Sequence, residues 1–548
     1  MNRSFAALTA FCILMPARFD AASFSIKEYF DRKFHPDTVQ VRPIEGLTER
    51  IVDGQLRLHL KDFVELVLKN STAINLTRLD VFTSADQIVA AKSPLDPLLV
   101  MSFNPLRTVS PEYNEIGGAA TLSSLTQTSF LNYQQLLPTG QTLQTNFTAL
   151  RNSTNSAFFF YNPNIDASLT VSLLQPLLRD RSRIEFEGPI RIARTELIIT
   201  SELSQAAIAD TIAQSAGQYW DAIRDRDVIK VQQQAVDLAQ KSYDRDKQAL
   251  DLGALAKLDI YQSETQVAER NRDLVQAQYT YKADLDGLRR FIGADLTPEL
   301  RKVEIVLQDE PAQLPPKTGI LPFEQALSKA LQTRPELSAA SRRLSVDDLN
   351  ARIARNLLQP RLDLTIQGGG AGLGGTPVPT EGPLGIEIPP PIGGLGNALH
   401  QSFGFTYPTY GAGLQLTLPF RNSSASAQLS DALVNHTRDR YAQRQVKQQI
   451  TLDVRQAINS LELAEATITA ATKARDLAQK NVEAEQQKYE LGTITAFEVL
   501  DSQNRLANTQ SALLDAFVGY QQAYVSYQRA TWSLLDGLGM ALETPKVR

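Results

Sequence analysis

Cysteine is almost absent from this chain, whose 548 residues contain a single one, Cys12. It lies in a mostly apolar run, residues 5–15, which follows Arg3 and precedes the small residues at 21–23. This order is typical of a secretory signal peptide, and we expect cleavage near Ala22. The exported protein would then have no thiol, which excludes disulfides, thiolate metal sites and a cysteine nucleophile.

Histidine is also scarce, and the four histidines share no metal-ligand spacing. The sequence contains neither a nucleophile elbow nor a pair of carboxylates with supporting residues around it. We therefore expect no enzyme activity, no cofactor and no bound metal. The histidines are His35, His59, His400 and His436.

An excess of positive charge is missing as well, because 55 Lys and Arg are interspersed with 60 Asp and Glu for a net charge of −5. Without a basic patch we expect no binding to nucleic acid. After the signal peptide no apolar stretch reaches the roughly 18 residues that a membrane-spanning helix needs. An exported chain of this kind belongs to the periplasm, the exterior or a β-barrel.

What the chain does contain is a duplication. The segment that starts at Leu252-Gly253 recurs at Leu491-Gly492, with an aliphatic residue and an acid in register at an offset of 239 residues (492 − 253). Each segment lies between two long helical patterns. So long a period indicates two repeats of one large helix-turn-helix unit, and it argues against a string of small repeats.

The helical patterns are unusually long, covering about residues 184–250 and 424–489, and a second helix returns after each Leu-Gly turn. At 1.5 Å per residue, roughly 65 residues give a rod of about 100 Å, more than an isolated core needs. Each repeat opens with a short amphipathic helix, at residues 60–68 and 323–331. A stripe at helical spacing predicts close packing of the second long helix: Val446, Ile450, Val454, Ala457, Leu461, Ala464, Ile468 and Ala471.

Alternating polar and apolar residues predict two strands per repeat and four per chain. Alternation with no charge on one face is typical of strands that lie between lipid and water. Residues 78–127 are interpreted as an irregular insertion, and residues 368–408 as a Gly- and Pro-rich loop. The predicted strands are residues 142–150, 167–173, 361–366 and 413–420.

Four strands cannot close a membrane barrel, because the smallest have about eight and an open edge in lipid leaves backbone groups without partners. Several copies of the chain must therefore share one barrel, and their long helices must share one tube. The predicted fold is mainly α with a membrane β portion. The predicted function is a conduit through the outer membrane.

Three motifs accompany this pattern: the helix end Leu331-x-x-Arg334-Pro335-Glu336-Leu337; the strand ends Gln175-Pro176-Leu177-Leu178 and Leu418-Pro419-Phe420; and Tyr489-Glu490-Leu491-Gly492-Thr493 followed by Phe497-Glu498-Val499-Leu500-Asp501. Together with the duplication they resemble the TolC-like outer-membrane efflux proteins, over about residues 58–540. The resemblance implies a homotrimer whose chains give four strands each to a shared 12-stranded β-barrel, continued by a trimeric α-helical tunnel. It also implies contact with outer-membrane lipid, a periplasmic adaptor (membrane fusion protein) and an inner-membrane transporter. The cell would be of Gram-negative type, with the helices in the periplasm.

The resemblance divides the chain into two efflux repeats with a Pro-rich linker between them. The segments are a signal peptide (1–22), an N-terminal extension (23–57), the first repeat (58–297, with the insertion at 78–127), the linker (298–321), the second repeat (322–540) and a tail (541–548).

The resemblance further implies that acids on the returning helix narrow the periplasmic mouth, at Glu498 and Asp501, with Asp259 as the first-repeat counterpart of Glu498. Glu498 and Asp501 are three residues apart and share a helical face. Threefold symmetry would make each a ring of carboxylates that repel one another and favour cations. The alternative for Glu498 is a capping box with Thr495, which is expected on any helix.

The Leu-Gly turns are expected to end the long helices, with glycine in the left-handed conformation. We also expect these exposed turns to touch the adaptor. The candidate residues are Leu252, Gly253, Leu255, Leu491, Gly492 and Ile494.

Residues 370–375 match the glycine spacing of a dinucleotide-binding fingerprint and follow a predicted strand. Thr376 and Pro377 come next, however, so a phosphate would have no helix N-terminus to bind. We interpret this segment as part of an extracellular loop.

The leading hypothesis is a passive trimeric exit duct of a tripartite efflux or type I secretion system, opened by its partners. The alternative is a periplasmic coiled-coil adaptor or structural protein that does not span the outer membrane. Such a protein would need no alternating strand pairs. A third hypothesis, an exported degradative enzyme, lacks a catalytic site in the sequence.

Overall fold

The computed structural model describes residues 40–111, 119–156, 159–181, 183–252, 260–315, 319–378, 393–491 and 493–540. It separates into two compact units, Met1–Ile44 and Glu45–Arg548. Residues 40–44 have no regular structure. The predicted signal peptide, the extension up to residue 39 and the tail from residue 541 lie outside the described residues. All helices and strands named below belong to the second unit.

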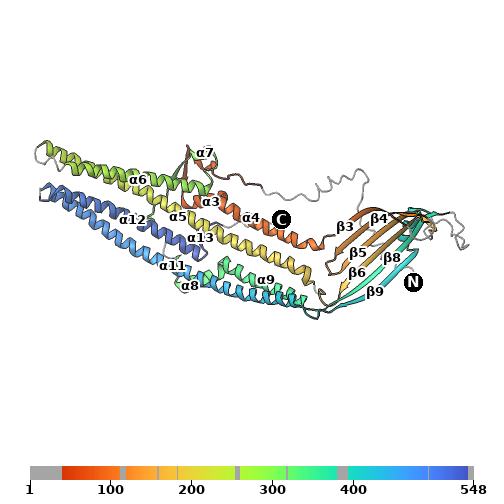
Figure 1. The fold of residues 1–548 in the computed structure, drawn as a ribbon. Helices are drawn as coiled ribbons and strands as arrows, with labels where there is room; N and C mark the ends of the chain where they lie inside the picture. Colours follow the sequence, from red (N-terminus) through yellow and green to blue (C-terminus); the bar gives the residue numbers. More distant parts are fainter. Residues whose placement is uncertain are drawn as a thin grey trace. The chain divides into compact units, whose positions relative to one another are not determined.

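The helices repeat the same order twice, which confirms the duplication. The long helices α5 and α11 have 68 residues each, a length of about 100 Å. Figure 1 shows α5 beside α6 and α11 beside α12, with both pairs ending on the side away from the strands. The first repeat contains α3 (Leu60–Asn70), α4 (Thr72–Lys92), α5 (Ile184–Asp251) and α6 (Ile260–Ile292); the second contains α8 (Phe323–Thr333), α9 (Pro335–Leu357), α11 (Ser423–Glu490) and α12 (Ala496–Ala530). Shorter elements are η1 (Thr48–Arg50), η2 (Ser93–Leu95), α7 (Pro298–Arg301), α10 (Leu395–Phe403) and α13 (Leu534–Leu538).

The interpretation of residues 78–127 as irregular is wrong. The helix α4 begins at Thr72 and continues to Lys92 as the counterpart of α9, and two strands follow it. Its pattern was hidden because apolar residues lie on several sides of α4: Val81 is buried, whereas Leu76 and Val89 are exposed. Among the helices in the described part of the chain, none combines the length and apolar character that crossing a bilayer requires.

The predicted apolar stripe of α11 forms part of a core shared with α8, α9 and α12. Ile450, Val454, Ala457 and Leu461 are buried there, and Val446, Ala464 and Ile468 pack against them. Small residues in the stripe allow the α12 backbone to approach closely. The partners from α12 are Tyr520, Ala523, Tyr527 and Ala530.

The main sheet has six strands in the order β3-β4-β5-β6-β8-β9, and each neighbouring pair is antiparallel. The prediction of four strands per chain is therefore wrong, because the segment interpreted as an insertion supplies two more. The four predicted strands are confirmed as β5, β6, β8 and β9. The bounds are β3 (Leu98–Pro111), β4 (Thr121–Leu136), β5 (Thr142–Thr154), β6 (Tyr161–Pro176), β8 (Arg361–Pro377) and β9 (Tyr407–Thr417).

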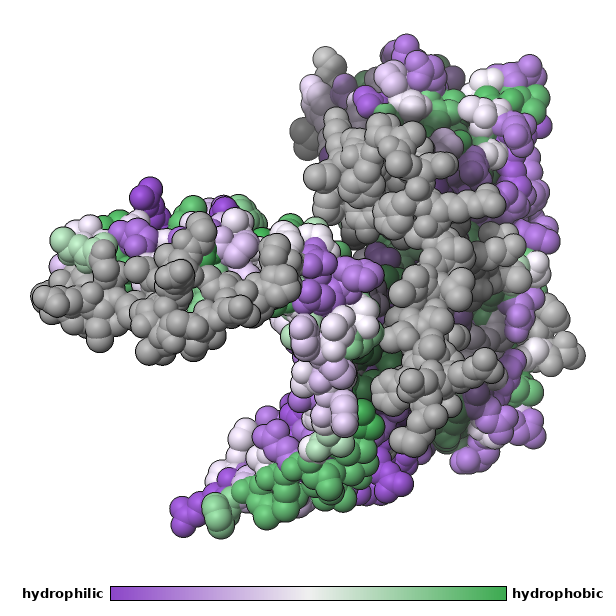
Figure 2. Space-filling view, turned by 90° about the vertical axis from the view of Figure 1, so that its right-hand side faces the viewer, coloured by the Kyte–Doolittle hydropathy of each residue, from purple (hydrophilic) through white to green (hydrophobic). Residues whose placement is uncertain are grey.

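The two faces of this sheet differ in polarity. Residues that oppose each other in neighbouring strands point to the same face. The strand register aligns the residues Met101, Leu131, Phe147 and Leu169 on one face. On the other face it aligns Asn132, Asn146 and Thr170. Figure 2 shows an apolar band, in green, along the lower arc of the view. An apolar face against a polar one is the pattern of strands between lipid and water.

The helix α10 lies on the apolar face, over a stretch of β8 rich in glycine. A Cβ atom on Gly370 would collide with the carbonyl oxygen of Ser402, and one on Gly372 with that of Ala398. The Ser402 hydroxyl donates to the Gly370 carbonyl at 3.0 Å. The loop predicted for residues 368–408 is therefore corrected, since its first residues continue β8 and its last ones form α10 and the start of β9. Residues 379–392 lie outside the described part.

A small second sheet joins the end of the predicted N-terminal extension to the predicted linker, in the order β1-β2-β7. Its strands are β1 (Ile51–Val52), β2 (Gln55–Leu58) and β7 (Glu304–Leu307), and β7 pairs with β2 in parallel. The predicted linker thus contributes structure of its own. Beside it, the Asp309 carboxylate accepts hydrogen bonds from the Tyr219 hydroxyl at 2.8 Å and the Leu60 amide at 2.7 Å.

Candidate functional site

The predicted docking and gate residues that the structure describes lie just after α5 and α11 or in the first turns of α12, at the end of the helix pairs away from the strands (Figure 1). Leu252 ends the first pair's outgoing helix with 85% of its surface exposed, and Leu491 occupies the same place in the second repeat at 79%. Ile494 is half-buried, and Phe497 is 63% exposed. Four predicted residues, Gly253, Leu255, Asp259 and Gly492, lie outside the described residues, so their roles stay predictions.

Glu498 caps the helix α12. Its carboxylate accepts a hydrogen bond of 3.1 Å from the Thr495 amide, and the Thr495 side chain bonds in return to the backbone of Glu498. This is the capping box that the sequence predicts, and it satisfies backbone donors that a helix start leaves free. The structural role of Glu498 is therefore confirmed, and an additional gate role stays a prediction.

Asp501 lies one turn further along α12 and is half-exposed. Its carboxylate is 2.6 Å from the Arg505 guanidinium, one turn later on the same helix. An exposed pair of this kind contributes little to stability, about 0.3–0.5 kcal/mol. The Arg505 guanidinium offsets the negative charge of the Asp501 carboxylate, and the gate role of Asp501 stays a prediction.

A buried carboxylate, Asp246, connects the two repeats close to this end. It lies in the last two turns of α5 and is 1% exposed. The Tyr489 hydroxyl of α11 donates to one of its oxygens at 2.8 Å, and the Ser263 hydroxyl of α6 donates to the other. Each carboxylate oxygen therefore has a partner from a different helix. The Arg245 guanidinium covers the Tyr489 ring at 4.6 Å, which adds a cation–π contact.

Further polar contacts extend this network to α12. The Arg270 guanidinium of α6 donates to the Asn504 side chain, and the Gln503 amide donates to the Ser242 hydroxyl at 3.4 Å. A cavity of about 340 Å³ lies between the four helices here. We call Asp246, Tyr489, Ser263, Arg270 and Asn504 the tip network.

Tyr489 belongs to one of the motifs found in the sequence, whereas no sequence pattern marked Asp246. The offset of 239 pairs Tyr489 with Leu250 and Asp246 with Glu485, so neither residue is repeated. The tip network breaks the internal symmetry of the chain. A comparison of unequal residues at equivalent positions would have pointed to it.

The Arg-Pro-Glu motif forms an ion-pair cluster at the other end of α12. The Arg334 guanidinium lies 2.8 Å from Glu336 and 2.7 Å from Asp453 of α11. Arg529 of α12 lies 2.8 Å from Glu336 and 2.5 Å from Asp210 of α5. Burial opposes the charge of Glu336, but the two guanidinium groups lower its pKa to about 2.

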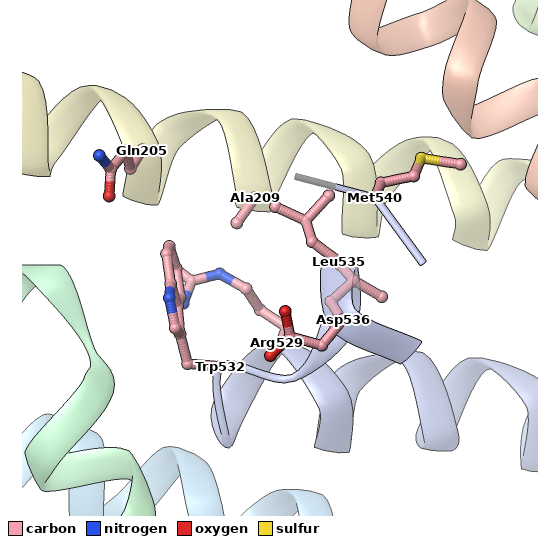
Figure 3. A pocket seen from close by; sticks show the side chains of 8 residues that line it. Gln205, Ala209, Arg529, Trp532, Leu535, Asp536 and Met540 are labelled. Atoms are coloured by element: carbon pink, nitrogen blue, oxygen red, sulfur yellow. The ribbon is translucent and has the colours of Figure 1, made fainter. Parts of the chain in front are cut away.

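Arg529 also borders a cavity of about 320 Å³ (Figure 3). Its guanidinium carbon lies 5.2 Å from the centre of the Trp532 ring. Figure 3 shows Gln205 and Ala209 of α5 on the facing side of the cavity. The motif therefore holds α5, α9, α11 and α12 together, which is a structural role.

A third charged group lies between α5, α6 and α12. Arg224 lies 2.7 Å from Asp225 and 3.1 Å from Asp221. Burial and the neighbouring Asp225 raise the pKa of Asp284 to about 7. Burial also raises the pKa of Asp515. Four acids thus share one arginine, and a proton on Asp284 relieves their repulsion at neutral pH.

The predicted strand-end residues lie where the sheet meets the helices. Gln175 and Pro176 are the last residues of β6 and oppose Leu364 and Asp363 of β8. Pro419 lies just after β9 and is exposed. Proline cannot donate to a ladder, so it marks the position where each strand pair ends.

No group of three or more potential metal ligands occurs among the described residues. His59 bonds to Asp309 at 2.7 Å, which raises its pKa, and His436 lies 3.6 Å from Asp348. The glycine-rich segment at 370–375 is part of strand β8, so its interpretation as a loop is wrong.

Comparisons with known proteins agree with this architecture. The family model described as outer membrane efflux protein matches residues 326–531. The toluene efflux pump outer membrane protein TtgC of Pseudomonas putida is 23% identical over 377 residues, which are 66% of this chain and 71% of that protein. The CmeC outer membrane channel of Campylobacter jejuni has a TM-score of 0.61 at 15% identity, covering 94% of this chain and 91% of that one. VceC of Vibrio cholerae has a TM-score of 0.60 at 15% identity, covering 86% and 95%.

The fold and these matches define an outer-membrane channel with helices that extend into the periplasm. Residues 326–531 match the outer membrane efflux protein family, and the predicted resemblance to the TolC-like outer-membrane efflux proteins is confirmed. This family is one of efflux ducts and not of enzymes.

Proposed function

We propose that this chain is a passive, homotrimeric exit duct whose periplasmic end is held shut by the tip network and opened by partner proteins. The observation that carries the proposal is a sheet with one apolar and one polar face at one end of the molecule, together with helix pairs that the tip network connects at the other end. The sheet has the polarity of a lipid–water boundary. The alternative, a periplasmic adaptor that never enters lipid, leaves the apolar face of this sheet without a purpose.

The tip network is the closing device in this proposal. Asp246 is buried and accepts bonds from both repeats, so separating α11 from α5 would leave a buried carboxylate short of a donor. Leaving such a group unsatisfied costs about 1–3 kcal/mol. A partner that pulls α11 and α12 outward must supply that free energy in each of three subunits.

The exposed turns are the docking surface for a periplasmic adaptor. Leu252 and Leu491 are large, apolar and mostly exposed, and Phe497 at the start of α12 is exposed as well. Exposed apolar residues at a helix end suit insertion between the helices of a partner. The adaptor in turn would connect the duct to an inner-membrane transporter of a tripartite efflux or type I secretion system.

Glu498 and Asp501 would form acidic rings at the mouth once three chains surround one axis. Carboxylate rings favour cations and repel one another. Before opening, Glu498 would be paired with Thr495 and Asp501 with Arg505 within each chain.

Trimer formation and docking are tested separately. Outer-membrane fractions should yield trimers that resist dissociation by detergent before heating. The double variant Leu252→Glu, Leu491→Glu should abolish adaptor binding and export while trimers remain, because charge on the turns prevents apolar contact. Leu296→Glu, a change at an exposed leucine away from the turns, serves as the matched control. Export that survives the double change, or a soluble periplasmic monomer, would refute the proposal.

A further inference from the structure

The six-stranded sheet ends in two strands with a free edge within the chain. The strands β3 and β9 lie at the ends of the strand order, and the four strands between them pair on both sides. A free edge in lipid leaves backbone groups without partners. The two edges must therefore be covered. In the trimer proposed above, another copy of this chain can cover them.

The two additional strands are part of the same sheet and not an appendage. The ladder between β4 and β5 runs without interruption from Ser124↔Thr154 to Leu136↔Thr142. A tight turn closes it, in which the Gly140 amide donates to the Leu137 carbonyl at 2.8 Å. Gly140 has a φ of 86°, which favours glycine. Peeling the hairpin away would break this ladder inside the membrane.

The polarity of the two faces also continues into the added hairpin. Leu99, Met101 and Phe103 of β3 point to the apolar face, opposite Tyr133, Leu131 and Ser129 of β4. All three β3 residues are more than half exposed in the single chain. A strand with a free edge and a row of exposed apolar side chains can pair with a strand of another copy while those side chains contact lipid.

We propose that copies of this chain join β9 of one copy to β3 of the next, so that a trimer closes a barrel of 18 strands and not of 12. The proposal rests on the trimer proposed above. β3 leaves α4 and runs away from the helices, whereas β9 returns to α11. The two edges are therefore antiparallel when copies repeat around an axis, as every other pair in the sheet is.

The register supports closure. The ladders place Leu98 of β3 level with Gly411 of β9, across the intervening strands. We call the junction between β9 of one copy and β3 of the next the seam. If Leu98 and Thr417, the strand ends nearest the helices, oppose each other at the seam, the register shifts by six residues (417 − 411) over the six strands of one chain. One residue of stagger per strand corresponds to a strand tilt of about 36°, within the range of about 35–45° for membrane barrels.

This register also keeps the faces matched at the seam. It sets Val100 against Gln415 on the polar face and Met101 against Leu414 on the apolar face. A slip by one residue would exchange the faces. Pro105 lacks an amide hydrogen, which is tolerated in a terminal strand and removes one seam bond at most.

The consequence is a wider exit. Barrel diameter grows roughly in proportion to strand number, so the mouth would be about 1.5 times as wide as that of a 12-stranded barrel. The barrel would then not limit the size of the transported molecule. The narrowest point would be the tip of the helices.

Cysteine cross-linking in a Cys12→Ser background tests the seam in the full chain. The pair Val100→Cys, Gln415→Cys should form disulfides between copies on mild oxidation, giving covalent trimers on denaturing gels. The rival pair Gln144→Cys, Gln415→Cys reports a 12-stranded barrel in which β5 is the edge, and it should stay uncross-linked. Replacing the second cysteine Gln415→Cys by Gly413→Cys or by Thr417→Cys tests registers shifted by two residues in either direction.

The outcomes separate the two proposals. Two results would overturn the 18-stranded barrel without affecting the proposed exit duct. One is a cross-link through Gln144→Cys. The other is a trimer in which none of the pairs with Val100→Cys forms a cross-link. Absence of any trimer before oxidation would overturn the proposed function itself.

Discussion

The Tyr489 hydroxyl donates a hydrogen bond of 2.8 Å to Asp246, although 243 residues separate the two along the chain. The bond joins the long helix of one repeat to that of the other, close to the free end of both. Because the carboxylate is buried, removing its donor costs more than the bond itself contributes. In the proposed closed state a few polar contacts hold the tip, whereas α8, α9, α11 and α12 also share a packed apolar core further along the helices.

Removing the Tyr489 hydroxyl should loosen the tip. We expect Tyr489→Phe to raise single-channel conductance in planar bilayers and to weaken the closed state by about 1–3 kcal/mol. Tyr441→Phe is the matched control, since Tyr441 lies on the same helix and is 64% exposed. Equal conductance in the two variants would contradict the proposed closing role.

The charge and the cap of Glu498 can be separated. Glu498→Gln keeps an acceptor for the Thr495 amide, whereas Glu498→Ala removes the cap and should cost about 1 kcal/mol. If the carboxylate ring matters, Glu498→Gln should lower cation selectivity, measured as a shift in reversal potential under a salt gradient. An unchanged reversal potential would leave Glu498 as a cap alone.

Glu336 should make the helical region sensitive to acid. Its pKa is lowered to about 2 in the folded chain, from 4.5, so its stabilising effect is present above pH 4.5 and lost as pH falls towards 2. We expect Glu336→Ala to lower the free energy of unfolding by about 3–5 kcal/mol, because Arg334 and Arg529 lose a buried partner. Thermal melting near neutral pH measures the loss, with Glu324→Ala at an exposed position of α8 as the control. Equal melting temperatures would show that the cluster is dispensable.

Asp284 should act in the opposite direction. Its pKa is raised from 3.8 to about 7 in the folded chain, so stability falls as pH rises from about 4 through 7. Asp284→Asn cannot ionise and should melt at a higher temperature than the unaltered chain at about pH 8, with little difference at about pH 4. Asp286→Asn, with its side chain 73% exposed, is the control. A variant that melts no higher than the unaltered chain at the higher pH would argue against the shared proton.

Gly372 should tolerate no side chain. A Cβ there collides with the Ala398 carbonyl, whereas nothing lies within 4 Å of a Cβ at Gly368 on the same face of β8. We expect Gly372→Val to displace α10 and to make it accessible to protease, with a cost of about 1–3 kcal/mol or more. Gly368→Val should leave α10 protected. Equal protease resistance in both variants would show that α10 does not depend on this contact.

The sequence located most of the architecture, but two segments remained hidden for identifiable reasons. The start of β3 is apolar on both faces, at Leu98, Leu99, Val100 and Met101, so it lacks alternation. The glycines of β8 look like a loop because their purpose, room for the α10 backbone, exists only once α10 is in place. The capping box at Thr495 was predictable because all its atoms lie within one turn of helix.

By itself, the sequence determined what depends on local pattern: the duplication, the two 68-residue helices, four of the six strands, the helix turns and the cap of α12. Periodicity and turn residues encode these features within short stretches of chain. The tertiary structure alone decided which distant residues meet, namely Asp246 with Tyr489, Glu336 with Arg529, and the hairpin β3–β4 with β5. Those contacts follow from how helices and strands pack over their whole length, which no local pattern records.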